Sequence, residues 1–216
     1  ERLVQAITQN ENIGIAYSQS YRMDNDNNLY GTWKSWTDDL DTDFFAKDFV
    51  CNGIEYINRF LIKKNTIPNA SAVIFKKEIF DSTGGADETI KYCSDWLLWM
   101  KILSRSDIAF ISECLNHFRF HTESVIAVVR EPHGKYNVSM RKKWKSFLEK
   151  EKIKILMNSA NENLSSEYFK WGEEHFNAGN KWRGCRYVIC SALYPSVDPV
   201  KLLQKMKYVV YRLLSL

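Results

Sequence analysis

The chain has 216 residues, of which 45% are hydrophobic and 14% aromatic, a composition typical of a globular protein and not of a disordered one. The apolar run at 125–129 is far too short for a membrane-spanning helix, and five cysteines without a CxxC pair favour a reducing, cytoplasmic setting over a disulfide framework. The net charge of +4 is uneven, because residues 1–135 carry 15 basic and 19 acidic side chains whereas 136–216 carry 15 and 7.

Helix and strand patterns alternate through the first part of the chain. We expect a helix at 1–10, then a buried strand at 13–23 and a turn at 24–31. A solvated acidic loop at 36–45 is expected to lead into a mostly helical stretch at 44–62. A strand at 71–75 and a helix at 76–85 that ends at glycines complete this part.

The next two elements are an apolar helix and a strand. Ser94 is a suitable N-cap for a helix whose apolar positions include Trp96, Trp99 and Leu103. Alternation across "HFRFH" (117–121) then indicates a strand, with His117, Arg119 and His121 on one face.

The sequence changes character after "REPHGK" (130–135), where turn residues coincide with the shift to basic composition. Amphipathic helices are predicted at 137–160, 165–179, 181–195 and 198–214. We therefore expect two domains, an α/β domain at 1–130 and an all-α extension at 131–216.

Five segments occur in an informative order: "LVQAITQNENIGIAYSQ", "PNASAVIF", "EIFDSTGGADE", "SDW" and "FRFHTES". Together they resemble the C-terminal half of the catalytic domain of family-two inverting glycosyltransferases, over residues 1–125. The resemblance implies an incomplete GT-A (Rossmann-like) half with a short mixed sheet. It also implies that the nucleotide-binding half, with its Asp-x-Asp metal motif, precedes "ERLVQAI" and lies outside this chain, which by itself is expected to be inactive.

The resemblance implies transfer of a sugar from a nucleotide-sugar to a hydroxyl of a glycan or lipid-linked glycan. Bacterial surface polysaccharide synthesis is the commonest context of the family. A divalent metal, Mn²⁺ or Mg²⁺, would be held mainly by the absent half. The alternative, from another class, is a non-catalytic interaction or membrane-surface module derived from a transferase.

Asp95 matches the residue that serves as general base in the family. A carboxylate in the first helical turn is favoured by the helix macrodipole, so we expect it to be ionised near neutral pH. Without the resemblance, the residues favour a structural role for Asp95 as the cap of a core helix. Trp96 is a candidate stacking surface for a sugar, whereas Trp99 fits better in the core.

The other candidate site residues also rest on the resemblance. His121 matches a histidine that contacts the metal or the donor phosphates, and Arg119 is expected to steady that loop by pairing with a carboxylate. Gly84 and Gly85 would let the backbone pass the acceptor pocket, with Asp87 as a ligand of sugar hydroxyls. The simpler explanation for Arg119 and His121 is a solvated edge strand, and the simpler explanation for Gly84 and Gly85 is a glycine helix cap.

Two further features have simpler explanations. "DDLDTD" (38–43) contains Asp-x-Asp patterns, but no buried hydrophobic strand precedes them, which argues against a metal motif. The basic C-terminal region suits solvated faces of packed helices, and it leaves open a peripheral contact with the inner face of the cell membrane. Nucleic-acid binding ranks last because no recognised motif accompanies the charge.

Overall fold

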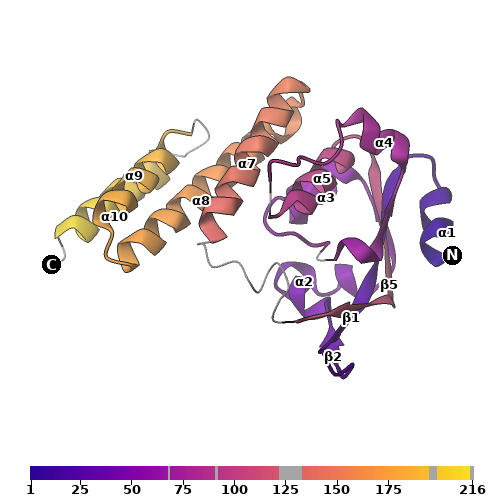
Figure 1. Cartoon of the computed structure of the whole chain (residues 1–216). Helices are drawn as coiled ribbons and strands as arrows, with labels where there is room; N and C mark the ends of the chain where they lie inside the picture. Colours follow the sequence, from indigo (N-terminus) through magenta and orange to yellow (C-terminus); the bar gives the residue numbers. More distant parts are fainter. Residues whose placement is uncertain (68, 91, 122–132, 195–198, 215–216) are drawn as a thin grey trace. The chain divides into compact units, whose positions relative to one another are not determined.

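The computed structural model describes all residues except 68, 91, 122–132, 195–198 and 215–216. The chain forms two compact units (Figure 1). The first comprises Glu1–Thr89 with Ser94–Arg130, and the second comprises Glu131–Leu216 together with Ile90–Cys93. Each unit is described by itself below.

The first unit is built on a long parallel strand pair. β1 (Ile13–Met23) pairs with β5 (Asp107–Arg119) along its whole length, and both were predicted, although β5 begins well before "HFRFH". The described strands form a mixed sheet in the order β2-β1-β5-β3, with β4 also paired to β1. The short strands are β2 (Leu29–Thr32), β3 (Phe49–Cys51) and β4 (Val73–Phe75), all antiparallel to their neighbours. This confirms an α/β architecture at the level of fold class.

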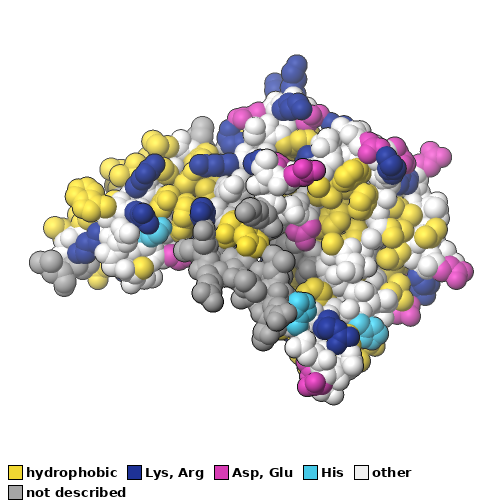
Figure 2. All heavy atoms as spheres, viewed as in Figure 1, with side chains coloured by type: hydrophobic (Ala, Val, Ile, Leu, Met, Phe, Trp, Pro, Cys, Tyr) yellow, Lys and Arg dark blue, Asp and Glu magenta, His cyan; other side chains and the backbone are white. Residues whose placement is uncertain are grey.

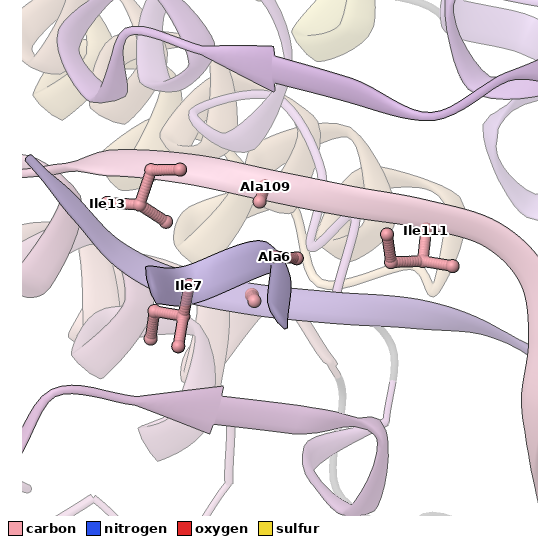
Figure 3. Packing of buried hydrophobic residues seen from close by; sticks show 6 residues of the cluster. Ala6, Ile7, Ile13, Ala109 and Ile111 are labelled. Carbon is pink, nitrogen blue, oxygen red and sulfur yellow. The ribbon is translucent and has the colours of Figure 1, made fainter. Parts of the chain in front are cut away.

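The first helix covers one face of this strand pair. α1 (Arg2–Thr8) buries Ala6 and Ile7 against Ile13 of β1 and Ala109 of β5, as Figure 3 shows. Small alanines at the contact let the helix backbone approach the sheet closely, and the branched isoleucines fill the space beside them. The result is a continuous apolar layer beneath α1.

The remaining elements of the first unit are short. They are α2 (Lys34–Asp41), η1 (Phe44–Ala46), α3 (Gly53–Tyr56), the π-helical η2 (Ile57–Leu61), η3 (Ala70–Ala72), α4 (Lys77–Ser82) and α5 (Ser94–Leu103). α5 is the most buried of them, with every residue from Trp96 to Leu103 in the core.

One prediction in this region was wrong, and a second was confirmed only in part. The acidic stretch within 36–45 belongs largely to helix α2 and not to a loop, because Lys34, Arg59 and Lys64 pair with its aspartates. The stretch 44–62 is mostly helical, as expected, but its helical residues are divided among η1, α3 and η2, and strand β3 interrupts them. β3 pairs with β5, a partner nearly 60 residues away, so helical periodicity in the local sequence was misleading.

The second unit consists of helices. They are α7 (His133–Lys150), η4 (Lys154–Leu156), α8 (Met157–Asn177), α9 (Lys181–Ala192) and α10 (Pro199–Leu214). A single helix at 137–160 was expected, but the chain breaks after Lys150, where Lys152 adopts a left-handed φ of 57°. No helix among the described residues is long and apolar enough to cross a membrane.

Helices α8 and α9 approach each other closely at two glycines. A Cβ atom placed on Gly172 would lie 2.6 Å from Val188, and one on Gly184 would lie 2.7 Å from the ring of Phe176. Because larger residues do not fit at these positions, the two helices can pack with their backbones in near contact.

Candidate active site

Asp95 lies in the first turn of α5 and is partly buried. The backbone N–H of Trp96 donates to Asp95 Oδ1 at 2.7 Å, and the side chain of Asn65 is close enough to the carboxylate to help lower its pKa. Asn65 is itself held in place, because its Oδ1 accepts from the N–H of Ile67 and its carbonyl accepts from the indole N–H of Trp36. The carboxylate therefore has a defined orientation.

Burial raises the pKa of Asp95 above its usual value, and the hydrogen bonds from Trp96 N–H, from its own N–H and from Asn65 oppose this only in part. The helix macrodipole, on which the expectation from sequence rested, favours the charged form and so acts in the opposite direction to burial. A carboxylate with a raised pKa is a stronger base once it is ionised.

Trp96 does not offer a stacking surface, contrary to the expectation from sequence. Its side chain is only 6% exposed, and its indole N–H donates to the carbonyl of Leu61 at 2.7 Å. Trp99 is also buried, as expected. Both rings are part of the core that holds the start of α5.

Gly84 and Gly85 end helix α4 in left-handed conformations, with φ values of 76° and 67°. The N–H of Gly85 donates to the carbonyl of Phe80, and that of Gly84 donates to the carbonyl of Asp81. This is the glycine helix cap that the sequence left open as the simpler explanation. The cap is attached to α5, because Lys101 Nζ donates to the carbonyl of Gly85 at 2.7 Å.

Asp87 lies in the exposed segment after this cap. Its Oδ1 accepts from both the N–H and the hydroxyl of Thr89, at 3.0 and 2.5 Å. The carboxylate thus stabilises its own turn.

His117 and Arg119 lie on the same exposed face of β5, as the strand period predicts, and His121 follows the end of the strand. His117 stacks on Tyr21. Arg119 Nη1 donates to the carbonyls of Asp24 and Asn25, so it steadies the β1–β2 turn through backbone oxygens, and its charge also helps to lower the pKa of the Asp24 carboxylate. Among the described residues, no hydrogen bond or ion pair joins Asp95 to His117, Arg119 or His121.

The described residues contain no group of three His, Cys, Asp or Glu side chains that could hold a metal ion. His121 therefore belongs to no such group.

A polar cluster in the middle of β1 was missed from the sequence. Ser18, Gln19 and Ser20 are buried, although they occupy strand positions in the middle of the sheet. Ser20 Oγ accepts from the side chains of Asn69 and Asn116, at 3.5 and 3.2 Å. The sequence pattern that could have indicated this cluster is the polar run "SQS" (18–20) inside an otherwise apolar strand.

A small cavity of about 10 Å³, the size of one water molecule, lies within this cluster. Its lining includes Ser18, whose Oγ has no hydrogen-bond partner within the part of the chain that the structure describes. Thr66 also lines the cavity and follows directly after Asn65, the residue that orients Asp95. Tyr56 hydroxyl connects Thr66 to Tyr17 through bonds of 2.8 and 2.9 Å.

A larger groove of about 500 Å³ lies elsewhere, between α1 and the strands β3 and β5. Arg2 at its rim pairs with Asp48 and Glu113, at 3.6 and 3.4 Å. None of the site residues predicted from the sequence lines this groove.

No family model, no curated protein and no solved structure matches the chain.

Proposed function

We propose that the chain is the acceptor-side part of a nucleotide-sugar-dependent, inverting glycosyltransferase, with Asp95 as the general base. The acceptor would be a hydroxyl of a glycan or lipid-linked glycan, as in surface polysaccharide synthesis. The observation that supports this most is the setting of Asp95. It is an oriented, partly buried carboxylate with a raised pKa at the start of a rigid helix.

The reaction requires removal of one proton from the acceptor hydroxyl as its oxygen attacks the anomeric carbon. The Asp95 carboxylate takes that proton, while the bond from the anomeric carbon to the nucleoside diphosphate breaks. Trp96 N–H and Asn65 keep the carboxylate oriented, and this lowers the cost of bringing it into reach of the hydroxyl.

The test compares sugar transfer by the natural protein containing this chain with that of its Asp95→Asn variant. Positioned general bases contribute roughly 10²- to 10⁴-fold, so transfer should fall by at least about 100-fold while nucleotide-sugar binding is retained. Asp38→Asn is the control, because the Asp38 carboxylate lies at the surface of α2 and pairs with Lys34. Equal turnover by Asp95→Asn would show that the base assignment is wrong. If the parent neither binds nor consumes any nucleotide-sugar, the chain is instead a non-catalytic module.

A further inference from the structure

Helix α10 has one face packed against the rest of the second unit. Tyr208 contacts the rings of Phe169 and Phe176 of α8. Two cations on the same side are also anchored there, since Lys205 Nζ donates to Ser165 Oγ and Arg212 donates to Asn177 Oδ1, both at 2.7 Å. These contacts fix which face of α10 points inward.

The opposite face of α10 is apolar and exposed. At 100° per residue, its apolar side chains fall within an arc of about 160°. They are between 45% and 75% exposed, and they are Val200, Leu203, Met206, Val210, Tyr211, Leu213 and Leu214. We call this set the outer face of α10. Seven exposed apolar side chains on a single helix exceed the scattered surface hydrophobics of a typical soluble domain.

The neighbouring helix α9 carries a second exposed apolar stripe. Trp182, Ile189 and Leu193 follow one another at intervals of seven and four residues, and Trp182 is 88% exposed. Figure 2 shows hydrophobic side chains next to Lys and Arg side chains over α9 and α10. Exposed Trp and Tyr beside aliphatic residues are typical of segments that reside at a membrane–water interface.

The positive charge of residues 181–214 indicates which kind of partner this apolar surface binds. Residues 181–214 contain seven Lys and Arg residues and a single acidic residue, Asp198. Arg183, Arg186 and Lys207 are exposed. A second copy of the chain would bring two such positive surfaces together, which disfavours self-association. Anionic lipid headgroups complement the charge, and acyl chains accept the apolar side chains.

We propose that the outer face of α10, with the adjacent stripe of α9, binds the surface of a membrane that contains anionic lipid. In this arrangement α10 lies in the plane of the interface, its apolar side chains enter the headgroup–acyl boundary and its exposed cations contact the headgroups. The inference does not depend on the transfer reaction proposed above.

Co-sedimentation of the full chain with phosphatidylcholine vesicles, with and without phosphatidylglycerol, tests the proposal. Binding is expected only with the anionic lipid and should weaken as salt is added. The double variant Leu203→Glu/Val210→Glu should lose binding. Its control is Ile155→Glu, which places a charge at a 70% exposed apolar position of η4 and should bind like the parent.

A second pair of variants tests the electrostatic part. Each cation near an anionic surface contributes about fivefold to partitioning, so Arg186→Gln/Lys207→Gln should bind roughly 25-fold more weakly. The charge-matched control Lys150→Gln/Lys154→Gln, on exposed positions of α7 and η4, should change binding little. The proposal is overturned if the parent does not bind anionic vesicles, or if both double variants bind as their controls do. It is also overturned if sedimentation equilibrium shows that the outer face instead joins two copies of the chain.

Discussion

The ammonium group of Lys101 donates a 2.7 Å hydrogen bond to the backbone carbonyl of Gly85. Lys101 belongs to the buried face of α5 and is only 9% exposed, whereas Gly85 ends the cap of α4. This bond joins the helix that carries Asp95 to the glycine turn preceding it in sequence, and it satisfies a carbonyl that the helix end would otherwise leave without a partner.

Replacement of Lys101 by Met should destabilise the first unit by about 1.5–3 kcal/mol. Methionine retains most of the side-chain volume but leaves the carbonyl of Gly85 without its charged donor. Urea denaturation measures the change in the free energy of unfolding, and Lys77→Met on the exposed surface of α4 serves as the control. A loss no greater than that of the control would show that the Lys101–Gly85 bond contributes little to stability.

The Asp95→Asn variant should be at least as stable as the parent at neutral pH. Burial raises the pKa of Asp95 in the folded chain above that in the unfolded chain. The stability associated with its protonated form is therefore complete below the unfolded pKa and is lost as pH rises through the folded pKa. Asparagine remains neutral, so the variant avoids this loss and its amide oxygen still accepts from Trp96 N–H.

Thermal denaturation of parent and variant at neutral and acid pH provides the measurement. The gain in the variant should disappear at acid pH, where Asp95 of the parent is protonated. Should Asp95→Asn instead lower stability at neutral pH, the main role of the carboxylate would be to hold the start of α5.

Gly53→Ala should be strongly destabilising, by about 3 kcal/mol or more. A Cβ atom at this position would lie 1.9 Å from the carbonyl oxygen of Ser106 and 2.2 Å from that of Leu103, and backbone atoms cannot move aside as a side chain can. Gly84→Ala separates this clash from backbone strain, because nothing lies within 4 Å of its Cβ position and only its φ of 76° is unfavourable. That variant should lose about 1–2 kcal/mol. Similar losses for the two variants in chemical denaturation would contradict the close approach of Gly53 to Ser106.

Arg141→Met should destabilise the second unit by about 3–5 kcal/mol. Arg141 and Glu167 form a buried ion pair at 3.4 Å, with side chains 2% and 9% exposed. Loss of the cation leaves the carboxylate of Glu167 buried, with Asn137 still donating to its Oε2 and the exposed Lys170 still pairing with its Oε1 at 3.5 Å. The double variant Arg141→Met/Glu167→Leu removes both charges and should regain most of the lost stability. If the double variant is no more stable than the single one, the two charges are not energetically coupled.

Local sequence was sufficient for the long and strongly patterned elements. β1, with eight consecutive buried residues, and α5, with its dense apolar core, were both predicted because their patterns extend over enough residues to exclude other structures. Short elements were missed because their patterns extend over too few residues to exclude other structures. β3 has three residues and exists because β5 pairs with it, and the ion pairs of α2 involve cations up to 25 residues away.

Local sequence alone predicted that Asp95 begins an apolar helix after a glycine turn, and that the C-terminal region is helical and basic. Three features depend on tertiary packing: Trp96 faces the core, burial raises the pKa of Asp95, and the apolar side of α10 points outward. Helical periodicity defines which side chains share a face, but not which face is covered. Coverage depends on distant segments such as Leu61 beside Trp96 and Phe169 beside Tyr208, and these come together only when the chain folds.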